Sequence, residues 1–206
     1  MKTHICAVFV ILLTSASMAV TATPYSPYHQ GGHQGMRAPA ASGSPATILE
    51  EGVKKLTTYI RSKNPQDRAR AVQYLKAEIA PYFDFAYMTQ WAAGPARRNM
   101  NAAQRGKMEG ELAKSFLAIL ATNLSSYNHQ KIRFFTPRGQ RQGEKTVSAW
   151  ILEQDGHITK LDFRFYRNKL GSWKIFDVKV AGTSAVSDYR NMFRQKLRSH
   201  QARASH

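Results

Sequence analysis

The chain has 206 residues, of which 43% are hydrophobic, and its 30 Lys and Arg against 13 Asp and Glu give a formal charge of +17. Its length fits one ordinary globular domain, and its apolar fraction excludes a disordered chain. The single cysteine, Cys6, excludes a disulfide framework and a cysteine-based zinc site. The excess of positive charge indicates an anionic partner: nucleic acid, an anionic membrane surface or an anionic ligand.

Residues 1–22 have the pattern of a cleaved secretory signal peptide. Lys2 precedes the apolar run Ile5–Leu13, and small residues up to Ala22 offer a cleavage site. The run is shorter than the ~20 residues that a membrane-spanning helix needs. We therefore expect an exported protein, and export argues against nucleic acid as the partner.

Residues 23–44 are rich in Pro, Gly, Ser and His and contain no acidic residue. This composition predicts a disordered tether ahead of a folded domain that spans residues 45–206. His29 and His33 lie four residues apart, a spacing that suits a metal ion only on a helix. Gly31 and Gly32 lie between them and disfavour a helix, so we expect no metal site.

Four helical segments are expected between residues 45 and 127. Ser44 with Pro45 starts the first, and Asn64 with Pro65 starts the second. Asp84 can cap the third, and Asn101 with Gln104 has the spacing of a capping box that opens a long fourth helix. The first helix carries an apolar face at the spacing i, i+4, i+7, i+11, formed by Leu49, Val53, Leu56 and Ile60.

Alternating apolar residues then predict four strands, over residues 132–136, 147–153, 160–165 and 173–180. Asp155-Gly156 is a hairpin turn signal between the second and third strands. A last helix begins after Ser184 and leads into a basic C-terminal tail. The expected fold class is α+β, with the N-terminal helices packed on a twisted four-stranded antiparallel sheet. The many apolar side chains of the sheet fit either a filled core or a lined pocket, which periodicity does not distinguish.

The sequence offers little support for catalysis. It has no HExxH, no P-loop and no GxSxG motif. Asp84 and Asp177 are both flanked by large apolar residues, where a carboxylate can act as the base of a pocket enzyme of the isomerase or dehydratase type. The alternative assigns structural roles: an N-cap for Asp84, a satisfied hydrogen-bond acceptor for Asp177, and a helix cap for Ser184.

A second alternative is a basic module that binds an anionic polymer. The last helix and tail carry five cations that would form it, and the competing interpretation is a solvated helix face. These cations are Arg190, Arg194, Lys196, Arg198 and Arg203.

Four segments, in order, resemble the MlaC family, also called the toluene-tolerance auxiliary family. Ile79–Met88 (IAPYFDFAYM) is similar to the family's PYFDF segment, and Ala102–Arg105 to the start of its long helix. Gly171–Val178 (GSWKIFDV) is similar to its GxWKVYDV segment, as Gly182–Phe193 is to its last conserved stretch. The resemblance covers about residues 48 to 198.

The resemblance implies a soluble periplasmic phospholipid carrier that buries acyl chains and shuttles lipid between the outer and inner membranes. It implies an apolar cavity between sheet and helices, phospholipid as the bound ligand, no cofactor and no covalent chemistry. The implied partners are an inner-membrane Mla-type ABC transporter complex and an outer-membrane Mla lipoprotein complex, with an anionic membrane surface in addition. From the net charge we expect a basic cavity rim that favours anionic head groups.

Thirteen residues are expected to contact lipid because their side chains are predicted to point into such a cavity. They are Met88, Leu117, Leu120, Leu124, Tyr127, Val147, Ala149, Ile151, Leu161, Phe163, Phe165, Val178 and Val180.

Overall fold

A computed structural model describes residues 43–62, 67–125, 130–139 and 141–204. The proposed signal peptide and residues 23–42 of the proposed tether, with His29 and His33, lie outside the described residues. The described elements are the helices α1 (Pro45–Ser62), α2 (Arg68–Tyr74), α3 (Phe85–Ala93), α4 (Ala102–Ser125) and α5 (Ala185–Ala204), and the strands β1 (Lys131–Phe134), β2 (Glu144–Leu152), β3 (Ile158–Arg167), β4 (Trp173–Val180) and β5 (Thr183–Ser184).

The strands form one antiparallel sheet in the order β1-β2-β3-β4-β5. Each strand pairs with its neighbour in sequence, so the sheet is a meander of hairpins. The expected α+β class is confirmed, but the sheet has five strands rather than four. The additional strand is the two-residue β5, which is too short to give a periodic signal in the sequence.

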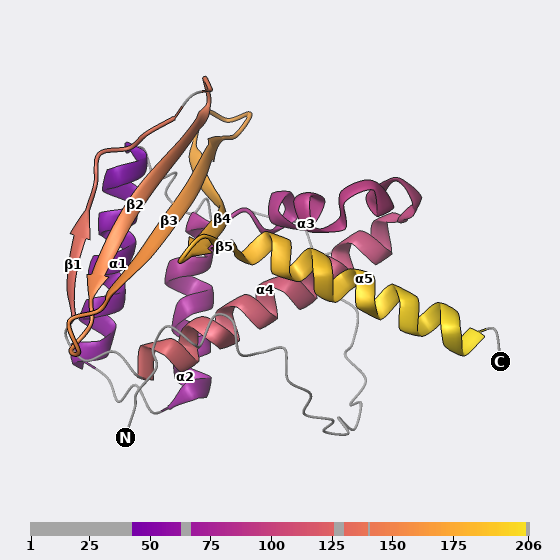
Figure 1. The fold of residues 1–206 in the computed structure, drawn as a ribbon, viewed down its shortest axis with the longest axis horizontal. Coiled ribbons are helices and arrows are strands. Elements are labelled where there is room, and N and C mark those ends of the chain that lie inside the picture. Colours follow the sequence, from indigo (N-terminus) through magenta and orange to yellow (C-terminus); the bar gives the residue numbers. More distant parts are fainter. Residues whose placement is uncertain (1–42, 63–66, 126–129, 140, 205–206) are drawn as a thin grey trace, which may run out of the picture.

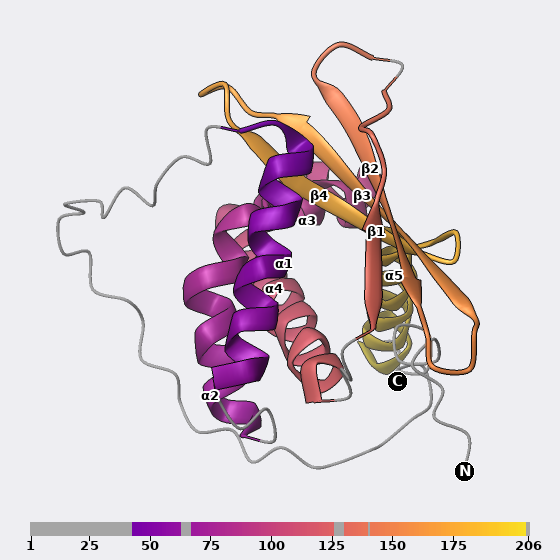
Figure 2. The same cartoon turned by 90° about the vertical axis from the view of Figure 1, so that its left-hand side faces the viewer.

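Figures 1 and 2 show that α1 and α4 lie on the same side of the sheet, whereas α5 runs out from the end of β5. The core contains Leu75 and Met88 from the helical layer and Val147 and Phe165 from the sheet, all completely buried. Aromatic rings of Phe83, Phe85 and Phe116 pack on one another beside this core. Within the described part of the chain, no helix is both long and apolar enough to cross a membrane.

The helix starts follow the capping residues of the sequence, with one exception. Asp84 accepts a hydrogen bond from Tyr87 N at 2.8 Å, and Asn101 and Gln104 form a reciprocal capping box with both bonds at 2.8 Å. The second helix begins later than expected: Asp67 caps α2, and Asn64 and Pro65 lie outside the described residues.

The second helix also ends early. After Tyr74 the chain continues as a π-helical turn over Leu75–Ile79 and a 3₁₀ turn over Ala80–Tyr82. Pro81 has no amide hydrogen to donate, so the α-helical pattern cannot continue through it. After these turns, Tyr82 lies beside Gly52 of α1, and Phe83 forms an isolated bridge with Ile175 of β4.

A β-bulge changes the facing of β4. Arg164 is opposite Asp177 and Phe165 is opposite Ile175, so Phe176 is one extra residue on the β4 side. Because the side-chain alternation shifts by one at the bulge, Ile175 and Val178 lie on the same face of the sheet. Asp177 lies on the opposite face, beside the start of α5.

Candidate functional site

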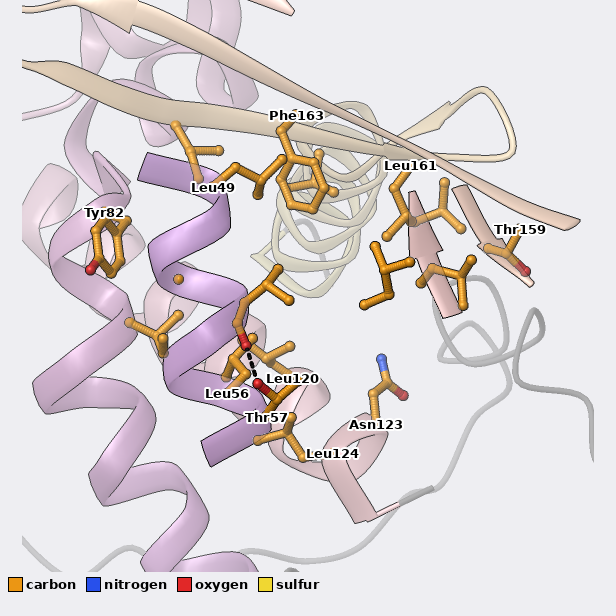
Figure 3. Close-up of a pocket in the computed structure, with 18 of the residues that line it drawn as sticks. Leu49, Leu56, Thr57, Tyr82, Leu120, Asn123, Leu124, Thr159, Leu161 and Phe163 are labelled. Carbon is orange, nitrogen blue, oxygen red and sulfur yellow. Dashed lines mark hydrogen bonds between the residues drawn. The ribbon is translucent and has the colours of Figure 1, made fainter. Parts of the chain in front are cut away.

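A cavity of ≈ 260 Å³ lies between α1, the second half of α4 and the sheet (Figure 3). Its wall is almost entirely aliphatic and aromatic. α1 contributes Ile48, Leu49, Gly52, Val53, Leu56, Thr57 and Ile60, and α4 contributes Phe116, Leu120, Asn123 and Leu124. The sheet contributes Ile132, Ile151, Thr159, Leu161, Phe163, Ile175, Val178 and Val180, and the remaining lining residues are Ile79, Tyr82, Phe83, Gln130 and Glu153.

The sequence of α1 explains why one whole side of the cavity is apolar. Its lining residues recur in pairs every third or fourth position, which places them on a single face of an α-helix. The face opposite carries exposed Glu50 and Lys54. α1 therefore covers the sheet with its apolar face without closing the space beneath it.

Four polar lining residues, Asn123, Gln130, Glu153 and Thr159, lie near the end of α4 and the turn between β2 and β3, whereas the Thr57 hydroxyl bonds the backbone of α1. Thr159 Oγ1 donates a hydrogen bond of 2.9 Å to Glu153 Oε1, and Gln130 Nε2 approaches Glu153 Oε2 at 3.4 Å. Asn123 projects into the space between α4 and this hairpin (Figure 3). The cavity is thus amphipathic, with an apolar body and one polar end.

Comparison with known proteins decides the family. The MlaC protein family model matches residues 50–205. This chain belongs to the MlaC family. It is 25% identical over 160 residues to the intermembrane phospholipid transport system binding protein MlaC of Haemophilus influenzae, with 74% of each chain covered. Its fold is similar to that of a phospholipid-binding protein from Ralstonia solanacearum in complex with a phospholipid, with a TM-score of 0.68 at 19% identity over 77% of this chain and 90% of that one.

Seven of the thirteen residues expected to contact lipid line the cavity of this MlaC-family chain. These are Leu120, Leu124, Ile151, Leu161, Phe163, Val178 and Val180. Five others are buried without lining it, and Tyr127 lies outside the described residues. The five are Met88, Leu117, Val147, Ala149 and Phe165.

The five buried residues lie outside the cavity for a common reason. A residue can line the cavity only if its side chain points into the space between the sheet and the helices. Where neighbouring side chains fill that space, the residue is buried in the core instead. Met88 and Phe165 are completely buried in the core cluster, at positions where neighbouring side chains leave no open space. Ala149 is paired with Leu161 on β3 and Phe134 on β1, and its own side chain is a single buried methyl group.

None of the thirteen residues expected to contact lipid lies on α1, although α1 forms a wall of the cavity. The apolar stripe of Leu49, Val53, Leu56 and Ile60 was recognised as a helix face, and all four residues line the cavity. An apolar helix face has the same periodic pattern in the sequence whether it packs on a filled core or lines a cavity. None of the described lining residues is Lys, Arg or His, so the positive charge expected at the rim does not come from the cavity wall itself.

Asp177 has a structural role. It is 1% exposed, and Ser184 Oγ donates to both of its carboxylate oxygens at 2.9 Å. Val186 N donates to Oδ1 at 3.2 Å, and Arg164 Nη1 lies 3.4 Å from Oδ2. The carboxylate therefore joins β4 to the start of α5, and it does not line the cavity.

Asp84 is also occupied by structural contacts. One carboxylate oxygen caps α3, and the other accepts a hydrogen bond from the Tyr166 hydroxyl. Burial of the Tyr166 hydroxyl, and secondly its hydrogen bond to Asp84, raise the pKa of Tyr166. Among the described residues, no group of three His, Cys, Asp or Glu is arranged to hold a metal ion.

A second cleft, of ≈ 520 Å³, lies between α3, the first turn of α4 and α5. It contains four arginines, Arg97, Arg98, Arg105 and Arg190, beside the half-exposed Trp91. Arg190 Nε donates to the Trp91 carbonyl at 3.1 Å. We call this surface the arginine cleft. None of the ion pairs found among the described residues involves its four arginines. Arg194 is exposed on α5, and the side chains of Lys196, Arg198 and Arg203 lie outside the described set.

Proposed function

We propose that this chain is a periplasmic phospholipid carrier that buries acyl chains and shuttles lipid between the outer and inner membranes. The observation that supports the proposal most directly is the amphipathic cavity, which has the polarity of a phospholipid. The name of the Haemophilus influenzae relative, an intermembrane phospholipid transport system binding protein, supports the same function. On this proposal, residues 1–22 are a signal peptide, residues 23–44 a tether and residues 45–206 the lipid-binding domain with a basic tail.

The physical need for such a carrier follows from the hydrophobic effect. Each methylene is worth ~0.8 kcal/mol, so two tails of about 15 methylenes represent on the order of 24 kcal/mol against water. A carrier does not have to bind lipid more tightly than a membrane does. It has to replace hydrocarbon surroundings with similar ones, and aliphatic residues such as Leu56, Leu120 and Val178 supply them.

The cavity volume sets a condition on this function. Pockets for drug-sized ligands have roughly 300–1,000 Å³, and a phospholipid with two tails is larger than such a ligand. A cavity of ≈ 260 Å³ must therefore widen to accept whole tails. We propose that α1 moves away from the sheet, because α1 forms one wall of the cavity with its apolar face.

The implied partners extend the proposal. We infer that the carrier exchanges lipid with an inner-membrane Mla-type ABC transporter complex and an outer-membrane Mla lipoprotein complex. It performs no covalent chemistry on this account. The hydrogen bonds of Asp84 and Asp177 support that inference, because each carboxylate is occupied by backbone and hydroxyl donors away from the cavity.

Native mass spectrometry of the protein purified without detergent tests the carrier function. We expect a stoichiometric adduct of phospholipid mass, which solvent extraction identifies as intact lipid. A bare protein mass that persists after incubation with liposomes would contradict the proposal, since the space beneath α1 would then have no ligand.

The arginine cleft supports a second candidate function, attachment to an anionic membrane surface. Clustered arginines are attracted to anionic lipid, and tryptophan is favoured at membrane interfaces. Changing Arg97 and Arg98 together to Ala should weaken sedimentation with anionic vesicles at low salt. The control changes exposed Arg141 and Lys169 to Ala, which removes the same charge elsewhere. If both variants lose vesicle binding to the same extent, the net charge of the protein, and not the arginine cleft, causes the binding.

A further inference from the structure

The charge on the cavity wall is unexpected for such a basic protein. Among the described residues that line the cavity, Glu153 is the one Asp, Glu, Lys, Arg or His. The wall therefore offers an anion to its ligand, although the chain as a whole has a formal charge of +17.

The backbone and two neutral side chains hold Glu153 in place. Its backbone N donates to the His157 carbonyl at 2.8 Å, which fixes it at the start of the β2–β3 hairpin. Thr159 Oγ1 and Gln130 Nε2 approach separate carboxylate oxygens at 2.9 and 3.4 Å. No Lys, Arg or His among the described residues lies within ion-pair distance of it. A carboxylate has about four acceptor positions, so capacity remains for a donor from the ligand.

A second acceptor lies at the same end of the cavity. Asn123 Oδ1 is buried and accepts no hydrogen bond from the chain. A buried acceptor without a partner is costly for a folded protein and usually indicates a missing water or ligand donor. Figure 3 shows Asn123 on α4 facing the side of the cavity on which Thr159 lies.

We propose that this acceptor cluster, Glu153 with Asn123, binds the primary ammonium of a zwitterionic phospholipid head group, as in phosphatidylethanolamine. The inference rests on the proposed carrier function and names the lipid class that it favours. The apolar body of the cavity takes the tails, so the polar end receives the head group.

The chemistry discriminates between head groups in two ways. A primary ammonium has a positive charge and three N–H donors, which match a carboxylate and an amide oxygen. A choline head group has the charge but no donor, and a glycerol head group has hydroxyl donors but leaves the lipid with a net negative charge that Glu153 repels. The expected order is therefore ethanolamine first, with the other two weaker.

The test is a competition between lipids with identical acyl chains. The delipidated full-length mature protein is incubated with vesicles of equal phosphatidylethanolamine, phosphatidylglycerol and phosphatidylcholine, and the bound lipid is extracted and quantified by mass spectrometry. We expect about fivefold enrichment of the ethanolamine lipid, which corresponds to about 1 kcal/mol, the upper range of a partly exposed ion pair. The isosteric Glu153→Gln variant should lose the enrichment but keep the same total lipid per protein.

The control is Asp155→Asn, which removes the same charge two residues away. Asp155 is exposed, accepts a hydrogen bond from His157 N and does not line the cavity, so this variant should keep the wild-type preference. Asn123→Leu removes the buried acceptor without leaving a new unpaired group, and it should lower the enrichment in a folded protein.

The outcomes separate the two proposals. Equal head-group ratios in the wild type and Glu153→Gln, with lipid bound to both, overturn the ammonium site and leave the carrier function intact. A wild-type preference for phosphatidylglycerol or phosphatidylcholine also overturns the site. A wild-type protein that takes up no lipid from any vesicle overturns the carrier function itself.

Discussion

The Ser184 hydroxyl lies 2.9 Å from both carboxylate oxygens of Asp177, and this contact fastens the start of α5 to β4. The same hydroxyl accepts a hydrogen bond from Ser187 N at 3.2 Å, so it also caps the helix. One serine and one aspartate thus connect the sheet to the last helix. This connection gives the Gly182-Thr183-Ser184 segment a structural role and agrees with the helix cap expected at Ser184.

Asp177→Asn should therefore destabilise the protein without preventing lipid binding. An amide keeps the size of the carboxylate but loses its charge and one acceptor, which leaves a buried donor of Ser184 or Val186 unpaired. We expect a loss of about 1–3 kcal/mol in the free energy of unfolding, measured by urea denaturation at pH 7.

Exposed Asp155→Asn is the control, with an expected change within about 0.5 kcal/mol. A folded Asp177→Asn protein that binds lipid normally supports the structural role. Loss of lipid from a fully folded variant would instead connect Asp177 to the function of the cavity, as the pocket-enzyme alternative requires.

The helix starts were the most predictable features of the fold, because their signals are local. Asp84 and the pair Asn101 and Gln104 cap the helices that their sequence positions indicate. A cap depends only on the next three residues, so tertiary contacts rarely change it. The exception, Asp67 in place of Asn64, lies in a polar stretch where several residues are able to cap.

The cavity wall was less predictable, because it depends on the sheet as a whole. The bulge at Phe176 puts Ile175 and Val178 on one face, whereas strict alternation puts them on opposite faces. The sequence of β4 contains no glycine or proline that marks the bulge. Periodicity also assigned Val147 and Ala149 to the same face as Ile151, but only the last of these lies beside open space.

Two tyrosines should respond in opposite directions to loss of their hydroxyl groups. The Tyr166 hydroxyl donates to the Asp84 carboxylate, so Tyr166→Phe should cost about 1.5–3 kcal/mol, the usual contribution of a hydrogen bond to a charged group. The Tyr189 hydroxyl is buried and makes no hydrogen bond, so Tyr189→Phe should stabilise the protein by up to about 1 kcal/mol. Denaturant titration of both variants at pH 7 measures the difference. Equal effects of the same sign would contradict the assigned contacts.

The same tyrosines predict a loss of stability at alkaline pH. Burial raises the pKa of Tyr189, and burial together with the bond to Asp84 raises that of Tyr166. Above the ordinary pKa of 10.0, the unfolded chain releases these protons while the folded chain still holds them. The folded state then binds more protons than the unfolded state. The free energy of unfolding therefore keeps the full contribution of these tyrosines below pH 10 and decreases as the pH rises above it.

The Tyr166→Phe/Tyr189→Phe double variant tests this prediction, because it removes both phenols. Its midpoint of thermal unfolding should fall less between pH 8 and pH 11 than that of the wild type. The single variant Tyr82→Phe serves as the control, because it removes a different phenol and should leave the alkaline slope of the wild type unchanged. An identical alkaline slope in the double variant and the wild type would contradict the prediction.

A tryptophan on the cavity face of α1 should block lipid uptake. Leu56 lines the cavity, and its replacement by Trp fills part of a space of ≈ 260 Å³ that already has to widen for a phospholipid. Thr58, two residues later on the same helix, is exposed, so Thr58→Trp adds the same side chain on the solvent side. We expect Leu56→Trp to reduce bound phospholipid several-fold in native mass spectra and Thr58→Trp to leave it unchanged. Circular dichroism of both variants verifies that the helices remain. If both bind lipid as the wild type does, the tails do not enter beneath α1, and the apolar space is part of the core.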